Sequence, residues 1–425
     1  MHDPSRRSVA RTTGVLIVAL ALVAAAGCAQ SANATWRAPG SAVGSSGAPD
    51  AGKLAQRVAG EITITPAADT TGVPVLDHAT VTVKDATLDT VTVTNPAGKQ
   101  VDGEFAADHK SWHTTESFGY AKVYSVAAKA TNITGQPIER TAKFTTYKPA
   151  NQTMPYLRAN GIHLLRERST YGVGQPVVIW FDEKITDKAA VQRLLEVTTS
   201  PHVEGAWSWV SSQEVHYRPK EYWRPGTSVQ VSANLYGRDL GGGLYGQSDV
   251  RADFTIGQSK IAIADANTKH MQVFFDGRMV KDIPVSMGKG GTVKGSDGQS
   301  INFWTNSGPH VVIGKTPTTR MTSASYGLTD PKDPNFYDEV VKLTVQISYS
   351  GEYVHLADWN IPDQGVTNTS HGCINVAPAL AQWFYDNFNA GDVVDVRGTP
   401  VRLGETNGLG DWTVSWDRWL QGSAL

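Results

Sequence analysis

Hydrophobic and polar residues alternate along much of the chain after residue 57, which is the pattern of strands that bury one face. Residues 79–94 are the clearest example, with apolar positions at Val81, Val83, Val91 and Val93. The next four residues, Asn-Pro-Ala-Gly at 95–98, are of the types that favour a turn between two strands. With similar runs at 120–131 and 140–147, this block predicts an immunoglobulin-like β-sandwich over residues 57–149.

A second block follows a linker-like stretch at 148–155 and repeats the same order of elements. It has a predicted strand at 175–185, a predicted short amphipathic helix at 187–197, and a closing strand at 251–257. We therefore predict a second sandwich over residues 150–257, related to the first by a divergent duplication. Five aromatic residues are expected in its core rather than in a carbohydrate-binding stripe: Trp207, Trp209, Tyr217, Tyr222 and Trp223.

Residues 258–400 contain further strand-like runs and are predicted to form a third, β-rich domain. Its one predicted helix begins at Pro378, a residue that suits the first helical turn, and ends with Gly391 as its cap. The apolar face of this helix consists of Trp383, Phe384 and Phe388.

The last segment, 401–425, is a tryptophan-rich extension whose indoles are expected to pack against neighbouring domains. The fold class is therefore mainly β. Two tandem immunoglobulin-like sandwiches precede a β-rich domain with one main helix and the C-terminal extension.

Composition and charge narrow the possible functions. The chain has 425 residues, enough for two to four domains, and 18% of them are charged, with a formal net charge of −2. This charge balance excludes the basic footprint of a nucleic-acid-binding protein. The Gly-rich loop at 288–298 lacks the spacing of a phosphate-binding loop.

The N-terminus is predicted to be a targeting segment over residues 1–28. A basic stretch precedes an apolar run that is too short for a comfortable membrane span, and the run ends at Ala25-Ala26-Gly27-Cys28. This ending resembles a bacterial lipoprotein box, which implies that Cys28 is lipidated. Ala25 stands where Leu is usual, so ordinary secretion and an uncleaved anchor are alternatives. Residues 29–56 are predicted to be a flexible tether outside the cytoplasm.

The second of the two cysteines, Cys373, lies in the stretch TNTSHGCINV at 367–376. It is a candidate nucleophile if a nearby histidine favours its thiolate. His371 lies two residues before it, and His355 ends a predicted strand 18 residues upstream. Gly372 permits a sharp turn that aims backbone N–H groups at one point, as an oxyanion hole requires. The alternatives are a buried thiol, a disulfide with Cys28, or a zinc site with the two histidines.

The arrangement of these residues resembles the signature of the L,D-transpeptidases with a YkuD-type catalytic domain. In that signature a histidine is followed, about 15 to 17 residues later, by [ST]-H-G-C-x-N. Every signature position is present: His355, Ser370, His371, Gly372, Cys373 and Asn375. The resemblance extends over residues 57–425, because two immunoglobulin-like domains precede the catalytic domain in actinobacterial and mycobacterial members.

The resemblance implies a reaction and a role for each matching residue. Cys373 attacks the third residue of a peptidoglycan tetrapeptide stem, D-Ala leaves, and a second stem accepts the acyl group in a 3→3 cross-link. His355 is the general base, and the backbone carbonyl of Leu356 orients its ring. His371 and Gly372 shape the oxyanion turn. The implied substrate-binding residues are Tyr326, Tyr337, Met321, Ser370, Asn375 and Trp359.

The resemblance also implies that carbapenems acylate the cysteine and that no cofactor or metal takes part. The expected partners are peptidoglycan stem peptides and, through the lipid anchor, the outer face of the cytoplasmic membrane, with the protein acting as a monomer in the cell wall. Nucleic acid is not an expected partner.

Two departures from the family pattern are visible. Residues 288–304 are longer than expected, and Thr305-Asn306-Ser307-Gly308 stands where the family commonly has T-P-x-G. These departures bear on loop geometry and acceptor preference. Two other functions remain alternatives: hydrolysis of the same stems, as an L,D-carboxypeptidase or cysteine peptidase, and non-catalytic binding to the cell wall.

Overall fold

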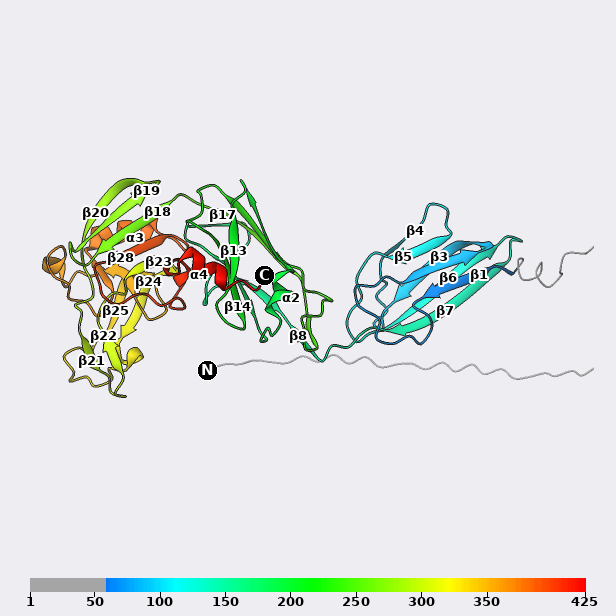
Figure 1. The fold of residues 1–425 in the computed structure, drawn as a ribbon, viewed down its shortest axis with the longest axis horizontal. Coiled ribbons are helices and arrows are strands. Elements are labelled where there is room, and N and C mark those ends of the chain that lie inside the picture. Colours follow the sequence, from blue (N-terminus) through cyan, green and yellow to red (C-terminus); the bar gives the residue numbers. More distant parts are fainter. Residues whose placement is uncertain (1–58) are drawn as a thin grey trace, which may run out of the picture. The chain divides into compact units, whose positions relative to one another are not determined.

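The computed structural model describes residues 59–425, and this part of the chain is mainly β, as predicted (Figure 1). The predicted targeting segment, its Cys28 and the whole predicted tether lie outside the described residues. No helix within 59–425 is both long and apolar enough to cross a lipid bilayer.

The first sandwich consists of a four-stranded and a three-stranded sheet. The strand order of the first sheet is β1 (Glu61–Thr65), β2 (Thr80–Lys84), β5 (Ser111–Thr114) and β4 (Gly103–Phe105). The second sheet has the order β3 (Ala86–Thr94), β6 (Val123–Asn132) and β7 (Pro137–Thr145). The predicted alternation is confirmed, because Val81, Val91 and Val93 are buried between the sheets. The predicted turn is present too, closed by the Gly98 N–H donating to the Asn95 carbonyl at 2.9 Å.

The second sandwich consists of two four-stranded sheets and a small two-stranded one. One has the order β10 (Ser169–Tyr171), β17 (Val250–Ile256), β15 (Ser228–Ala233) and β12 (Leu195–Ser200). The other has the order β13 (Gly205–Trp209), β14 (Glu214–Pro219), β11 (Val177–Phe181) and β9 (Pro155–Arg158), while β8 (Asn151–Thr153) pairs with β16 (Leu244–Gly246). Trp207, Tyr217 and Trp223 are buried in its core, with Trp209 and Tyr222 packed against it, as predicted.

The helix predicted at 187–197 is much shorter in the structure. Helix α2 spans Lys188–Gln192, and Leu195 already belongs to β12. The start is as expected, because the Asp187 carboxylate accepts the Ala190 N–H at 2.8 Å and caps the helix. Beyond Arg193 the prediction is wrong, since pairing with β15 buries Leu195 in the core and takes over the backbone hydrogen bonds.

The third domain is built on a nine-stranded sheet. In sheet order its strands are β23 (Gly308–Val311), β28 (Val393–Arg397), β18 (Lys260–Asp265), β19 (His270–Phe275), β20 (Arg278–Ser286), β27 (Ile374–Val376), β26 (Tyr353–Leu356), β25 (Asp338–Gln346) and β24 (Gly314–Thr322). The unexpectedly long segment 288–304 forms a separate hairpin of β21 (Thr292–Lys294) and β22 (Ser300–Asn302).

Helix α3 (Pro378–Asn387) packs against this sheet and starts at the predicted proline. Phe384 and Phe388 are buried and stacked with ring centroids 4.0 Å apart. The predicted cap at Gly391 is wrong, because the helix ends with Phe388 as its C-cap residue. Gly391 has a positive φ of 89°, and a Cβ there would lie 2.5 Å from the Gly172 nitrogen, so this glycine permits close approach to the second sandwich.

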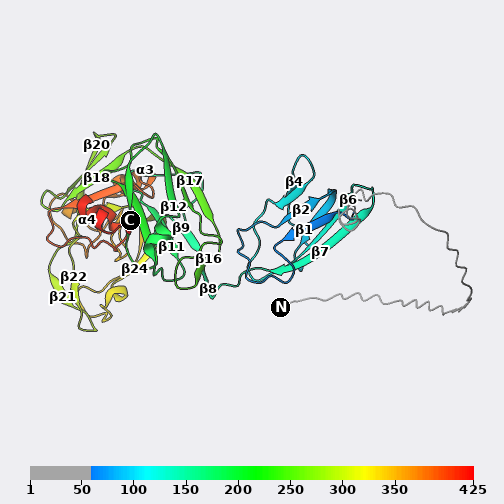
Figure 2. The same cartoon turned by 45° about the vertical axis from the view of Figure 1, so that its right-hand side comes forward.

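The C-terminal extension contains η3 (Gly410–Thr413) and α4 (Trp416–Gln421), and α4 lies against the second sandwich in both views (Figures 1 and 2). The Trp412 indole donates to the Gly174 carbonyl at 2.7 Å, and the Trp419 indole donates to the Ala206 carbonyl at 2.9 Å. The Arg218 guanidinium lies over both rings. The extension therefore packs against a neighbouring domain, as predicted.

Candidate active site

Two adjacent parallel strands bring Cys373 and His355 to one face of the large sheet. His355 in β26 is in register with Asn375 in β27. Cys373 precedes Asn375 by two residues, and side chains two residues apart in an extended chain point to the same face. Both side chains line a single cavity of about 400 Å³, together with Trp359, which we call the histidine-side cavity.

The His355 ring is fixed by the backbone. Its Nδ1 lies 2.8 Å from the carbonyl oxygen of Leu356, so the Nδ1–H donates and Nε2 keeps its lone pair. The Leu356 contact uses only the main chain, as the resemblance implied. Burial lowers the pKa of His355 to about 4, and this hydrogen bond opposes the shift only in part. The imidazole is therefore neutral near pH 7 and able to accept a proton.

The Cys373 thiol donates to the Gly351 carbonyl at a sulfur–oxygen distance of 3.6 Å. Burial raises the pKa of the Cys373 thiol, the Tyr353 backbone N–H lowers it, and the Glu352 carboxylate raises it further. Burial therefore favours the uncharged thiol in the unliganded site, and no histidine is among the groups that shift its pKa. Because both groups are desolvated, the uncharged thiol and uncharged imidazole are the favoured pair. The proton must move as the sulfur attacks.

The turn before Cys373 is set by Ser370 and Gly372. The Ser370 hydroxyl donates to the Cys373 carbonyl at 2.6 Å and accepts the Gly372 N–H at 3.1 Å. Gly372 has a φ of 139°, whereas a Cβ there would make only ordinary contacts, the nearest at 3.7 Å. Glycine is thus needed for its backbone conformation and not for space. The Ser370 hydroxyl holds the loop, although the residue also lines the histidine-side cavity.

His371 is packed between aromatic rings and a lysine. Its ring centroid lies 4.9 Å from that of Phe303 and 5.0 Å from that of Tyr337. The Lys289 Nζ approaches its Nε2 at 3.3 Å and also donates to Asn335 at 2.7 Å. Burial and the Lys289 charge lower the pKa of His371 to about 4. His371 is therefore a neutral residue whose Nε2 is occupied by Lys289, whereas the Nε2 of His355 stays free to act as a base.

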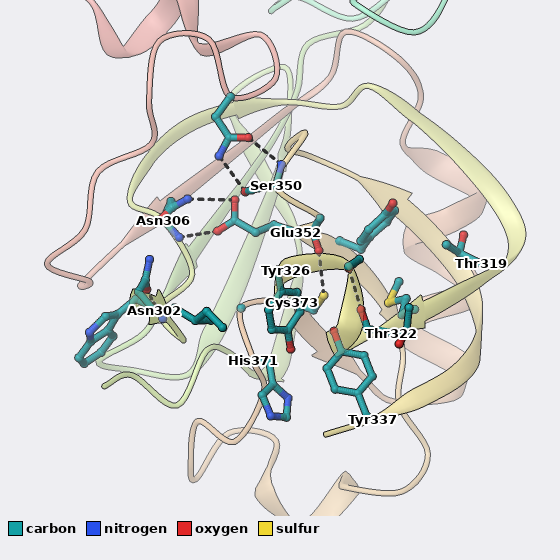
Figure 3. Close-up of a pocket in the computed structure, with 18 of the residues that line it drawn as sticks. Asn302, Asn306, Thr319, Thr322, Tyr326, Tyr337, Ser350, Glu352, His371 and Cys373 are labelled. Carbon is teal, nitrogen blue, oxygen red and sulfur yellow. Dashed lines mark hydrogen bonds between the residues drawn. The ribbon is translucent and has the colours of Figure 1, made fainter. Parts of the chain in front are cut away.

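A second cavity, of about 320 Å³, is also lined by Cys373 (Figure 3). It is lined by the hairpin residues Ile301 and Asn302 and by Trp304, and we call it the hairpin-side cavity. Four side chains border both cavities: Met321, Tyr337, His371 and Cys373. The two cavities therefore adjoin at these four residues, Cys373 among them.

Residues 320–339 contain the implied substrate-binding residues Met321, Tyr326 and Tyr337, and the structure puts this segment, which we call the lid, beside both cavities. Tyr326 lines the hairpin-side cavity, and burial raises the pKa of both Tyr326 and Tyr337. Both hydroxyls therefore stay protonated at neutral pH and can donate hydrogen bonds. The hairpin supports the lid, because the Ser296 N–H donates to the Gly327 carbonyl at 2.7 Å.

The remaining predicted site residues lie in the histidine-side cavity. Asn375 is buried in its wall, whereas Trp359 is 56% exposed and stacks on His355 with centroids 5.9 Å apart. Three further residues at the site were missed by sequence reasoning: Lys289, Trp304 and Glu352. No signal in the sequence distinguished Glu352, a single carboxylate directly before β26.

No group of three or more His, Cys, Asp or Glu side chains in residues 59–425 is arranged to hold a metal ion. Cys373 is a free thiol. The chemistry that this site can perform is acyl transfer, because a nucleophile, a neutral base and protonated hydroxyl donors meet at one point.

Comparisons with known proteins agree with this chemistry. The family model described as L,D-transpeptidase catalytic domain matches residues 259–396, and the model of a bacterial Ig domain matches residues 70–239. L,D-transpeptidase 2 of Mycobacterium tuberculosis (strain CDC 1551 / Oshkosh) is 42% identical over 354 residues, which cover 83% of this chain and 82% of that protein. L,D-transpeptidase 5 of M. tuberculosis (strain ATCC 25618 / H37Rv) is 33% identical, covering 88% and 80%.

Among solved structures, that of LD transpeptidase LdtMt1 in complex with imipenem is 28% identical, with a TM-score of 0.46, and the match covers 57% of this chain and 99% of that one. The chain belongs to the L,D-transpeptidase family, and it is an enzyme of the family that acts on peptidoglycan stem peptides.

Proposed function

We propose that this L,D-transpeptidase forms 3→3 cross-links between peptidoglycan stems through an acyl-enzyme on Cys373. The observation that carries the proposal is the shared face of Cys373 and His355, with the His355 Nδ1–H bound to the Leu356 carbonyl. This leaves Nε2 as a neutral base in the cavity that Cys373 also lines. The reaction is then acyl transfer with D-Ala as the leaving group.

In the first half-reaction the sulfur attacks the carbonyl carbon of the third residue of the donor stem. The thiol proton passes to His355 Nε2 as the C–S bond forms, and the carbonyl oxygen becomes an oxyanion. The Cys373 backbone N–H, which follows the Gly372 turn, and the protonated hydroxyls of Tyr326 and Tyr337 are the proposed donors to this oxyanion. The proton on Nε2 then passes to the amide nitrogen of D-Ala, the C–N bond breaks, and a thioester remains.

In the second half-reaction the side-chain amine of an acceptor stem attacks the thioester. The amine gives a proton to Nε2 while the new C–N bond forms, and this proton returns to the sulfur as the C–S bond breaks. No net oxidation or reduction occurs. The enzyme therefore ends the cycle with its thiol and imidazole uncharged, as they began.

The two cavities suggest where each substrate lies. Both the departing D-Ala nitrogen and the incoming amine exchange a proton with His355, which borders only the histidine-side cavity. We therefore place these two groups in the histidine-side cavity. The acyl part of the donor, which stays on the sulfur through both steps, then occupies the hairpin-side cavity.

Incubation with purified tetrapeptide stems tests the reaction. We expect cross-linked dimers and released D-Ala from the wild-type protein, and neither from Cys373→Ala. Tripeptide without dimer would instead establish hydrolysis, and no change in the stems would contradict catalysis. Intact-protein mass spectrometry with a carbapenem tests the acyl-enzyme, because one adduct is expected on the wild type and none on Cys373→Ser.

We also propose that Cys28 carries a lipid that holds this protein, as a monomer, at the outer face of the cytoplasmic membrane. The support is the sequence alone: a basic stretch, an apolar run and a lipoprotein-like box, followed by a tether that reaches to residue 56. Cell fractionation tests this. The full chain should be found with membranes, and Cys28→Ala should release it or stop its processing. Membrane-free wild-type protein would contradict the anchor.

A further inference from the structure

Glu352 is a buried carboxylate in the wall of the hairpin-side cavity (Figure 3). It is 5% exposed and directly precedes β26, the strand that carries His355. Its Cγ lies 3.9 Å from the position that a Cβ on Gly372 would take, so it is next to the turn that aims the sulfur. Glu352 is therefore a charged group inside the site that the acyl transfer itself does not use.

Glu352 is the one carboxylate among the residues that line this cavity. The other charged side chain in its lining is Arg320, and that guanidinium makes two hydrogen bonds to the Asp338 carboxylate, at 2.8 and 2.7 Å. The rest of the lining consists of neutral groups, among them Asn302, Asn306 and His371, whose pKa is lowered. A ligand in this cavity therefore meets the Glu352 carboxylate, with no lysine and no free arginine among the lining residues.

The Glu352 carboxylate is held in place by the segment that departs from the family pattern. The Asn306 backbone N–H donates to its Oε1 at 2.6 Å, and the Asn306 side-chain amide approaches Oε2 at 3.5 Å. Asn306 stands where the family commonly has proline, which has no N–H to donate. The substitution thus provides the donor that orients this carboxylate.

His310 contacts the Glu352 carboxylate but makes no hydrogen bond to it. It is fully buried, and its Nδ1–H donates to the Gly308 carbonyl at 2.9 Å. Its Nε2 lies 3.4 Å from the Glu352 Oε2, yet this nitrogen has no hydrogen bond. The carboxylate is consequently rigid and backed by protein on one side, and it keeps hydrogen-bonding capacity toward the cavity.

We propose that Glu352 is a specificity residue that binds the side-chain ammonium of the donor's third residue, the residue that stays on the sulfur. This inference rests on the proposed function, which places that residue in the hairpin-side cavity. A buried carboxylate favours a cation that replaces its lost hydration, and it disfavours a neutral side chain that leaves it unpaired. Glu352 therefore discriminates between donor stems by the charge of their third side chain.

Two tetrapeptide donors that differ only at the third residue provide the test, one with lysine and one with norleucine. The wild type should prefer the lysine donor by about 10- to 100-fold in kcat/KM, the range expected for a hydrogen bond to a charged group. Glu352→Gln should reduce this preference to about 1- to 3-fold, mainly through KM, and Glu352→Asp should keep part of it. Glutamine still accepts the Asn306 N–H, so the fold should survive.

Asn306→Pro is the matched variant, because it removes the orienting N–H and leaves the charge of Glu352 unchanged. It should also lower the preference for the lysine donor. The ratio between the two donors cancels any change in thiol reactivity. Adduct formation with a β-lactam that has no cationic side chain reports that reactivity separately.

An unchanged donor ratio in Glu352→Gln would overturn the inference, as would an equal loss on both donors. The proposed function fails in a different way. In that case the wild-type protein would convert neither donor and would form no β-lactam adduct, whatever residue stands at position 352.

Discussion

Two histidines of this protein are buried to the same extent, and their environments push their pKa values in opposite directions. His355 and His216 are each 4% exposed. His355 has only a backbone carbonyl as partner, and burial lowers its pKa to about 4. Burial alone would also lower the pKa of His216, but Asp411 at 2.6 Å and Glu214 at 2.8 Å outweigh it and raise the pKa to about 10.

The difference shows what each region is built to do. A neutral buried imidazole with one free nitrogen is a base that costs little to keep uncharged. A charged imidazole between two carboxylates joins the second sandwich to the C-terminal extension, since Glu214 belongs to β14 and Asp411 to η3. The first arrangement serves chemistry, and the second serves the docking of two segments.

The largest expected effect comes from removing the catalytic base. His355→Gln should lower the rate of acylation by about 10²- to 10⁴-fold, because no other group takes the thiol proton. The change removes a neutral side chain and breaks no ion pair, so the melting temperature should fall only slightly. Stopped-flow or mass-spectrometric assays measure the acylation rate, and calorimetry measures the melting temperature. Near wild-type acylation would remove His355 from the mechanism.

At His216 we expect a loss of stability with little change in acylation. Asp411→Asn leaves a buried imidazolium with one partner fewer and should lower the free energy of unfolding by about 3–5 kcal/mol. Acylation of Cys373 at 25 °C should stay within about twofold of wild type in protein that remains folded. Urea unfolding and carbapenem adduct formation give the two readouts. A large loss of acylation in a fully folded variant would contradict the separation of the two regions.

The pH dependence should separate the histidines as well. His216 has a folded pKa near 10 against an ordinary value of 6.5, so its stabilisation is complete below about pH 6.5 and is lost as the pH rises toward 10. Acylation depends on neutral His355, so it should instead fall only as the pH drops toward about 4. Thermal unfolding and acylation rates over pH 4–10 measure the two profiles. His216→Gln should flatten the pH profile of thermal stability and leave the pH profile of acylation unchanged.

The smallest expected effect is at Trp359, which stacks on His355 and is largely exposed. Trp359→Ala should slow acylation by about 2- to 10-fold, since an aromatic pair contributes about 0.5–1.5 kcal/mol to ring orientation. Trp359→Phe keeps a stacking ring and should recover most of the rate. Equal losses in both variants would mean that the indole contacts substrate rather than orienting His355.

Local signals were sufficient for most of the fold. The alternation at residues 79–94 predicted two strands and their buried valines, and Pro378 marked the start of α3. The failures share one cause. The helix predicted to continue through Leu195 gave way to pairing with β15, and Gly391 serves contact with Gly172 rather than the helix cap. Both outcomes depend on a segment far away in the chain, which a local pattern does not contain.

In the candidate site too, some residues could be predicted from the sequence and others could not. The order His355, Ser370 to Cys373 and Asn375 was enough to indicate the family's chemistry, because these residue types at this spacing are specific to it. Glu352 was missed, since a single glutamate has no meaning until Asn306 and His310 are placed around it. Lys289 was missed for the same reason, as it meets His371 only across the folded loop.

The sequence by itself thus determined which groups react, which strands form and where the chain belongs among known families. The tertiary structure alone decided the charges of those groups. Protonation in a protein depends on lost hydration and on the partners that replace it, and both are set by segments distant in the chain. That is why His216 and His355, two equally buried strand histidines, have pKa values shifted in opposite directions.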